Sequence, residues 1–202
     1  IILSVVVVFA GSRLYSQYRE QVIRTEESQL LTMAGIVGNN LNSYMEQQLE
    51  EIDLFYSREG MPENVWAESG GINARTAYFL KENAGVYNWI TVTEPDGTKF
   101  RYEPGKKTFQ ESADGEVKTV DSQNENHPAE ITGKEISDQT GWYELYIEKN
   151  VPVGSEVYML TFAMDLGALY EKIVAPVKIG EAGYSSVKDQ NMNIIMHHVK
   201  NQ

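Results

Sequence analysis

The side chains with the clearest chemical potential in this chain are suited to holding a small charged molecule. Arg101 lies in a strand–turn–strand pattern, and its planar guanidinium matches the two oxygens of a carboxylate. Asp165 ends a later run of mostly apolar residues and offers a carboxylate to an ammonium group. Aromatic residues on the predicted strands supply the apolar cup that a ligand site needs. The candidate ligand-binding residues are Trp89, Thr91, Arg101, Tyr102, Tyr143, Tyr158 and Asp165, with Phe162 as a further wall residue.

Each of these residues also has a purely structural interpretation. Large aromatic side chains dominate the packing of protein cores, so any one of the tyrosines fits a core position as well as a ligand contact. Arg101 fits equally well as a solvated charge on a strand. The two interpretations differ in what they require of the sheet, because only a ligand site needs a cavity beside Arg101 and the tyrosines.

Other chemistries find little support. The sequence has no phosphate-binding loop, no paired-histidine zinc motif and no glycine-flanked serine elbow. Cysteine is absent, which excludes disulfides, thiolate metal sites and cysteine nucleophiles. His197 and His198 are adjacent on a predicted strand and are expected to point to opposite faces, so they do not form a shared metal site. We expect no metal, no cofactor and no enzymatic activity.

Composition points to a folded, acidic protein. The chain has 202 residues, of which 42% are hydrophobic, enough for a substantial core in one or two domains. Its formal net charge is −12, which repels nucleic-acid phosphates. We therefore expect no nucleic-acid partner.

The first 56 residues predict one long helical region in two parts. Residues 1–11 are apolar and uncharged but shorter than the roughly 20 residues that cross a bilayer, so we interpret them as the end of a transmembrane helix. A buried strand and a signal-peptide core are the alternatives. Residues 12–56 carry apolar side chains at steps of three or four and predict a helix on the order of 60 Å long. The first half of this helix either pairs with a second copy, giving a homodimer, or packs wholly on its own domain.

The rest of the chain predicts strands and short helices. A helix is expected over Asn73–Glu82, a hairpin over Tyr87–Thr93 and Lys99–Tyr102, and long strands over Trp142–Val153 and Glu156–Asp165. The last strand has no polar face, so it belongs in the centre of its sheet. A helix over Leu166–Val174 and a second hairpin ending at His197 follow. Residues 104–139 are polar and acidic and are expected to form a long surface segment with at most one short helix or turn.

This order of elements, together with three motifs, resembles the extracytoplasmic Cache sensor domains of bacterial membrane signal-transduction receptors. The motifs are Met164-Asp165-Leu166 with Leu169, Gly180-Glu181-Ala182-Gly183-Tyr184, and the Val187–His197 hairpin. The resemblance implies an α+β fold, in which a long N-terminal helix packs on a PAS-like antiparallel sheet. His198 replaces the proline usual after the hairpin's histidine, and Trp142-Tyr143 lacks the arginine that precedes this pair in the amino-acid-binding subgroup. We therefore predict no particular ligand class from the family.

The resemblance divides the chain into a transmembrane end (1–11), a signalling stalk (12–56), a sensor unit (57–166), and a connecting helix with the start of a second unit or the closing hairpin of a single one (167–202). It implies a sensory input domain outside the cytoplasm, anchored by the N-terminal helix. Its cytoplasmic output would be a histidine kinase, a chemotaxis signalling rod or a cyclic-dinucleotide synthase. Arg13, Arg19 and Arg24 favour the opposite orientation, but this charge rule compares both flanks of a membrane helix. The alternative function is a ligand-free structural or dimerisation module of a membrane protein.

Overall fold

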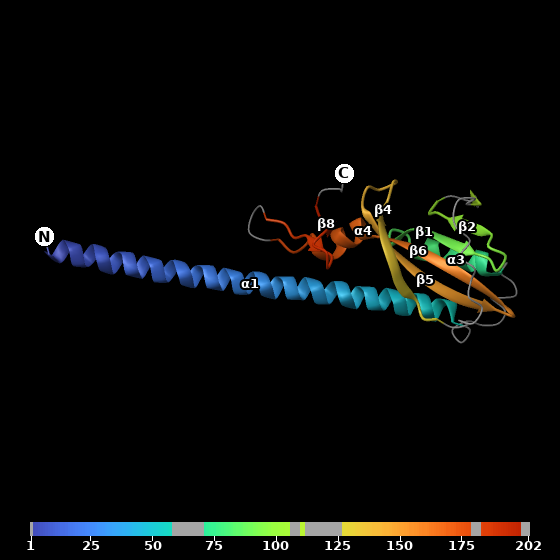
Figure 1. Ribbon diagram of the computed structural model, residues 1–202, viewed down its shortest axis with the longest axis horizontal. Helices are drawn as coiled ribbons and strands as arrows, with labels where there is room; N and C mark the ends of the chain where they lie inside the picture. Colours follow the sequence, from blue (N-terminus) through green and yellow to red (C-terminus); the bar gives the residue numbers. More distant parts are fainter. Residues whose placement is uncertain (1, 58–70, 106–109, 112–126, 179–182, 199–202) are drawn as a thin grey trace.

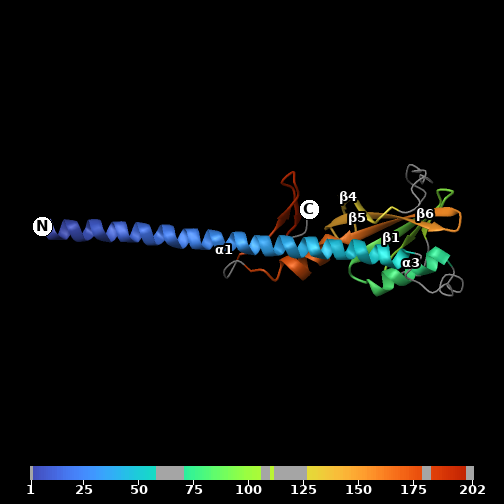
Figure 2. The same cartoon turned by 90° about the horizontal axis from the view of Figure 1, so that it is seen from below.

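One very long helix and one antiparallel sheet dominate the computed structural model, which describes residues 2–57, 71–105, 110–111, 127–178 and 183–198. Figures 1 and 2 show helix α1 (Ile2–Tyr56) running along the sheet at its C-terminal end and projecting far beyond it at its N-terminal end. Its 55 residues correspond to about 80 Å at about 1.5 Å per residue. The predicted α+β fold, with a long helix on an antiparallel sheet, is confirmed.

Burial divides α1 into two parts. Every described side chain from Arg13 to Ile36 is exposed except the half-buried Val22, and Val37 is the first buried one. From there the buried positions continue through Gln48 and Ile52 to Tyr56. The helix therefore becomes buried against its domain close to Gly35 and Gly38. Among the described residues, no helix contains a stretch long and apolar enough to cross a bilayer.

The sheet has six strands in the order β3-β2-β1-β6-β5-β4, and all neighbours are antiparallel. The predicted first hairpin is confirmed, and β6 has a neighbour on each side, as its apolar faces predicted. The strands are β1 (Tyr87–Thr93), β2 (Lys99–Tyr102), β3 (Gln110–Glu111), β4 (Glu130–Ile136), β5 (Tyr143–Val153) and β6 (Glu156–Asp165).

The prediction for residues 104–139 was wrong, because this segment contributes β3 and β4. In β4, no side chain is fully buried, and even Ile131 and Ile136 are 47% exposed. A strand at the edge of a sheet is held by backbone hydrogen bonds to one neighbour, here β5, and needs no apolar alternation. The sequence pattern therefore gave no signal for it.

The core lies between the sheet and two helices. Helix α3 (Gly71–Glu82), predicted from Asn73, packs on the same face of the sheet as α1, and we call this side the helix face. Phe79 of α3, Tyr56 of α1 and Phe162 of β6 meet there, with ring centroids 5.6–5.9 Å apart. Tyr56 donates a hydrogen bond to Thr76 Oγ1 (3.2 Å), and burial raises the pKa of Tyr56 well above its usual range. This phenol therefore stays neutral and serves as a donor inside the core.

The helix predicted after β6 is also present. It starts as α4 (Leu166–Leu169) and continues as one π-helical turn, η2 (Tyr170–Val174). Asp165 caps it, because its Oδ1 accepts hydrogen bonds from the amides of Gly167 (2.8 Å) and Ala168 (3.4 Å). Gly167 permits a close approach, since a Cβ there would lie 2.4 Å from the Trp142 ring.

The predicted second hairpin forms a two-stranded sheet of its own, β7 (Val187–Lys188) and β8 (Ile194–Met196). Met196 is buried and belongs to the main core. In the turn, Asp189 Oδ1 accepts hydrogen bonds from the amides of Asn191 and Asn193. Lys134 of β4 reaches Asp189 Oδ2 at 2.5 Å, so an ion pair ties the hairpin to the edge of the large sheet.

A second ion pair joins α1 to the middle of the sheet. Lys149 of β5 is only 6% exposed and lies on the helix face, where its Nζ approaches Asp53 Oδ1 of α1 at 2.8 Å. Lys149 also donates to the carbonyl of His127 (2.9 Å), and Asp53 accepts from the amide of Ala129 (2.8 Å). One carboxylate thus holds the helix, a central strand and the start of β4 together.

Replacing Lys149 with methionine should lower the free energy of unfolding by about 2–4 kcal/mol, because it leaves Asp53 and the His127 carbonyl without their cation. Chemical denaturation measures this. The same change at Lys81, an exposed position of α3, is the control and should cost less than about 0.5 kcal/mol. Combining Lys149→Met with Asp53→Leu should restore part of the loss. If Lys149→Met is as mild as the control, the ion pair has no structural role.

The hairpin contact should also be sensitive to acid. Hydrogen bonds from Lys134, and then from Asn193 and the turn amides, hold the pKa of Asp189 far below its usual range. Stabilisation by this group is therefore complete above the unfolded pKa of about 3.9 and is lost as the pH falls towards the lower folded value. Asp189→Asn should melt at a lower temperature than the parent at pH 6, with the gap narrowing below about pH 4. Exposed Asp138→Asn is the control, and a gap for Asp189→Asn that is independent of pH would contradict the assignment.

Candidate functional site

The strand register divides the predicted site residues between the two faces of the sheet. Thr91 pairs directly with Arg101 and with Thr161, and Trp89 pairs with Ala163, so their side chains share the face turned away from α1, which we call the outer face. Tyr102 pairs with Ile90, and Tyr158 pairs with Val151, both on the helix face. Tyr143 begins β5 and packs against the core from that same side.

Three of the predicted residues come together on the outer face. The guanidinium of Arg101 lies over the ring of Trp89, 4.3 Å from its centroid, and Thr91 is its cross-strand neighbour. Arg101 Nε lies 3.1 Å from Glu103 Oε1, within ion-pair distance, but this buried N–H makes no hydrogen bond. Stacking on Trp89 and the ion pair with Glu103 therefore hold this cation in place on the outer face.

Glu144 is a residue of this face that the sequence analysis missed. It is 3% exposed and accepts hydrogen bonds from Asn88 Nδ2 (2.7 Å) and Trp89 Nε1 (3.2 Å). Its direct cross-strand neighbours are Glu135 on β4 and Asp165 on β6, so carboxylates form a row across the sheet. Nothing in the sequence distinguished Glu144 among 29 acidic residues.

Tyr146, also missed, connects the aromatic and acidic groups. Its ring lies 5.6 Å from that of Trp89, and its hydroxyl donates to Glu135 Oε2 (3.2 Å). Burial, with the charges of Glu135 and Glu144, raises its pKa to about 12. The local field on this side of Trp89 is therefore negative, whereas Arg101 supplies the positive charge on the other side.

The other predicted residues do not join the group around Arg101, although Asp165 pairs with Glu144 across the sheet. Asp165 uses a carboxylate oxygen to cap α4 and lines a separate hollow of about 210 Å³ beside Tyr44 and Lys172. Tyr102 is 7% exposed and donates to Asn73 Oδ1 (2.7 Å), and Tyr158 donates to Glu156 Oε2 (3.1 Å). Tyr102, Tyr143 and Tyr158, like the fully buried Phe162, therefore fit the core-packing interpretation.

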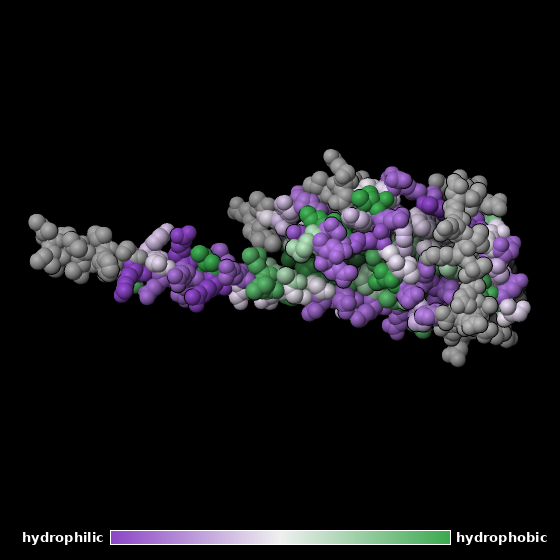
Figure 3. Space-filling model, viewed as in Figure 1, coloured by the Kyte–Doolittle hydropathy of each residue, from purple (hydrophilic) through white to green (hydrophobic). Residues whose placement is uncertain are grey.

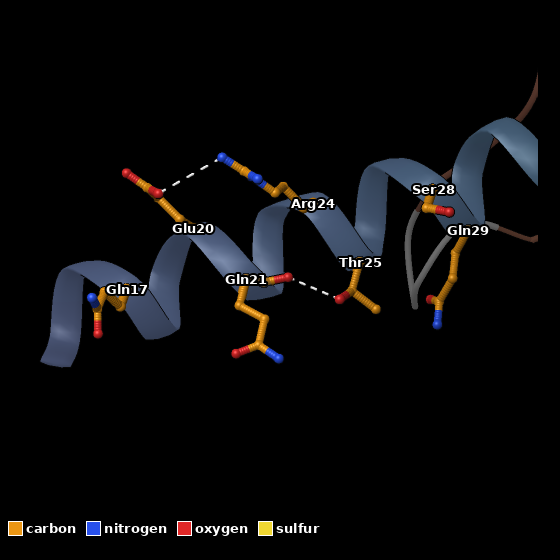
Figure 4. Close-up of a pocket in the computed structure, with 7 residues that line it drawn as sticks. All are labelled: Gln17, Glu20, Gln21, Arg24, Thr25, Ser28 and Gln29. Carbon is orange, nitrogen blue, oxygen red and sulfur yellow. Dashed lines mark hydrogen bonds and ion pairs between the residues drawn. The ribbon is translucent and has the colours of Figure 1, made fainter.

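Two further hollows involve α1. The first is lined by seven polar or charged residues from Gln17 to Gln29, and Figure 4 shows that all of them come from one helix without an opposing wall. The second is an apolar groove of about 520 Å³, between Leu30–Leu41 of α1 and a wall formed by Val177 and Tyr184–Lys188, which includes β7. Figure 3 shows hydrophobic side chains gathered where α1 reaches the domain. Neither hollow is lined by Arg101, Trp89 or Glu144.

The histidines lie beyond the end of β8, so the expectation that they point to opposite strand faces was wrong. Their ring centroids are 4.1 Å apart, and both rings contact Tyr184. Within the described ranges, no three histidine, cysteine or acidic side chains converge on a position that would hold a metal ion.

Comparisons with known proteins support the fold. No protein-family model matches the chain, and no curated protein is similar in sequence. The solved sensory domain of the Campylobacter jejuni chemoreceptor Tlp3 is similar, with a TM-score of 0.53 and 13% identity over 88% of this chain and 72% of that one. The ligand-binding domain of Tlp3 with L-valine gives a TM-score of 0.51, 13% identity, and coverage of 88% and 71%.

A likeness to the extracellular domain assigned to the histidine kinase vpHK1S-Z8 is weaker, with a TM-score of 0.48 and 15% identity over 73% of this chain, and we draw nothing from it. This chain spans 60% of that domain and about 70% of the Tlp3 domain. At these identities the likeness shows the fold alone. That fold, a long helix on an antiparallel sheet, is the one that the resemblance to Cache sensor domains predicted.

Proposed function

We propose that this chain is an extracytoplasmic sensory input domain that binds a small carboxylate-bearing molecule on the outer face of its sheet. The observation that carries the proposal is the state of Arg101. Its guanidinium is held over Trp89 and beside Glu103, and the side chain keeps 32% of its surface exposed to solvent. A carboxylate oxygen is the acceptor that this geometry suits, because the guanidinium fork matches two oxygens at once.

The surroundings of Arg101 support a ligand with an apolar part. Trp89 and Tyr146 are both half-buried and offer aromatic surface, and Thr91 offers a hydroxyl on the same face. The similar Tlp3 domains were solved with L-valine and 4-methylisoleucine bound. Those ligands are known for that protein, and they make small carboxylic acids and amino acids the first compounds to test on this one.

Signalling would pass through α1. The helix is continuous from the sheet to its N-terminal end, where residues 1–11 would enter the membrane, so a shift at the sheet moves a rigid rod. If two positions of this helix differ in free energy by a few kcal/mol, a ligand that binds one of them modestly better shifts the population towards that position. The output domain would be a cytoplasmic kinase, chemotaxis rod or cyclic-dinucleotide synthase.

The domain division is part of the same proposal. Residues 57–166 would form the sensor unit and residues 12–56 the stalk, while residues 167–202 would form a connecting helix and the start of a second unit. The separate β7-β8 sheet and the exposed apolar groove between it and α1 support such a continuation. A closing hairpin of a single unit remains the alternative.

Replacing Arg101 with alanine should abolish binding of any carboxylate ligand found in a thermal-shift screen of amino acids, organic acids, amines and nucleobases. In the parent chain a ligand at 100 times its Kd adds about 2.7 kcal/mol of stability, which raises the melting temperature clearly. Lys99→Ala is the matched control, since Lys99 is the next cation on the same face of β2. A folded Arg101→Ala variant that binds as well as the parent would rule out this role.

A dimerisation role is supported by a separate observation on the stalk. Between residues 13 and 36, α1 presents side chains at steps of three and four, five of them apolar, and six of the seven are exposed. Such spacing suits a coiled-coil seam with a second copy. The stripe consists of Tyr15, Tyr18, Val22, Thr25, Gln29, Met33 and Ile36.

Cysteine cross-linking tests the dimer cleanly, because the chain has no native cysteine. A cysteine introduced at Tyr18 should form a disulfide-linked dimer under mild oxidation, since a two-fold axis brings the same residue of both copies together in a parallel pair. Glu20, on the opposite side of the helix, is the control position and should cross-link much less. Equal yields at both positions would indicate random collision and contradict a specific seam.

A further inference from the structure

We propose that a bulge in β1 is the joint through which the outer face of the sheet acts on α1. The proposal rests on the proposed function in one respect: a ligand beside Trp89 is what would drive the joint. It adds named residues on both sides of the sheet, Glu144 outside and Gln48 inside, and it can be tested without any ligand.

The bulge explains how neighbouring residues reach opposite faces. Tyr87 pairs with Met164 and Trp89 pairs with Ala163, so Asn88 is an extra residue with no partner of its own on β6. In a regular strand, residues two apart point to the same side. Because of the extra residue, Tyr87 enters the helix face while Trp89 lies on the outer face.

On the outer face the joint is fixed to β5. Asn88 Nδ2 and Trp89 Nε1 donate to the two different oxygens of Glu144, at 2.7 and 3.2 Å. These bonds pass over β6, because Glu144 pairs with Asp165 and β6 lies between β1 and β5. Arg101 lies over the ring of Trp89, so a ligand bound there can displace Trp89. Because Trp89 and Asn88 share the Glu144 carboxylate as acceptor, displacing Trp89 changes the hydrogen bond of Asn88 as well.

On the helix face the joint is fixed to α1. The Tyr87 side chain is 1% exposed, and its hydroxyl donates to Gln48 Oε1 of α1 (3.1 Å), itself a buried residue. Its ring packs against Phe79 and Phe162 at 5.8 and 5.6 Å. A tightly packed ring cannot absorb a shift of its backbone by itself, so a movement of the bulge reaches Gln48.

A double-mutant cycle tests the joint. Glu144→Gln removes one acceptor on the outer face, and Tyr87→Phe removes only the hydroxyl that reaches α1. If the bulge couples them, their effects on the unfolding equilibrium constant should depart from simple multiplication by about threefold or more. Tyr56→Phe is the matched control, because it deletes an equally buried hydroxyl that bonds Thr76 and not the joint. Its combination with Glu144→Gln should multiply to within about twofold.

Hydrogen exchange gives a readout that a purely structural role would not move. Glu144→Gln should speed exchange of the α1 amides around Gln48 more than that of the α1 amides around Val37, and this difference should vanish in the Tyr87→Phe background. If Glu144→Gln does not fold, Trp89→Phe replaces it, since it removes Nε1 and keeps an aromatic ring. Multiplicative effects in both cycles, or uniform exchange along α1, would overturn the joint. Loss of binding in Arg101→Ala concerns the proposed function and leaves this result unaffected.

Discussion

The ion pair between Lys149 and Asp53 sets the position of α1 on the sheet. Lys149 lies among apolar side chains on the helix face, between Ile147 and Val151 on the same strand. A buried ammonium group is costly unless it is paired and hydrogen-bonded, and here the helical carboxylate of Asp53 and the carbonyl of His127 satisfy it. Sliding the helix by even one residue would separate the two charges. Apolar packing alone tolerates such a slip more readily. The ion pair therefore fixes the position of α1 along the sheet, which hydrophobic contacts do not fix by themselves.

The other polar contacts of α1 depend on that register. With Asp53 fixed, Gln48 meets the Tyr87 hydroxyl, and Tyr56 meets Thr76. The carbonyl of Phe55 accepts from the buried Arg75 of α3, whose guanidinium also lies near the Phe55 and Tyr56 rings. The helix is thus held at defined points over its last three turns, whereas its side chains from Arg13 to Ile36 are exposed apart from the half-buried Val22. A long rod fixed at one end only turns a small movement of the sheet into a larger displacement at the other end.

Local patterns in the sequence predicted most of the elements, and the parts they missed have clear physical reasons. The β-branched and aromatic side chains of residues 87–93 and the Pro95–Gly97 turn were enough for the first hairpin, because these signals lie within a few residues of each other. Strand β4 escaped because an edge strand with no fully buried side chain leaves no hydrophobic pattern. Three tyrosines were grouped with Arg101 on aromatic character alone. Strand parity already separates Tyr102 from Arg101, since adjacent residues point to opposite faces.

The candidate site was predictable only in part, because its two halves are joined across strands far apart in the sequence. Trp89, Thr91 and Arg101 come from one hairpin, and the strand register places them on one face of the sheet. The sequence named them only within a larger set that included Tyr102, Tyr143 and Tyr158. Glu144 and Tyr146 arrive from β5, on the far side of β6, and Asn88 matters only through a bulge that no local pattern reveals.

These distant residues give the outer face its electrostatic character. Directly opposed carboxylates on neighbouring strands repel each other. The row across β4, β5 and β6 consists of Glu135, Glu144 and Asp165, so this repulsion acts across three strands. Asn88 and Trp89 offset part of it with neutral donors, but no cation is paired with Glu144 among the described residues. The guanidinium of Arg101 lies over the ring of Trp89 and also pairs with Glu103. A ligand with several negative charges would gain from Arg101 and lose to the carboxylate row, whereas one with a single carboxylate and a neutral or positive remainder meets no such penalty.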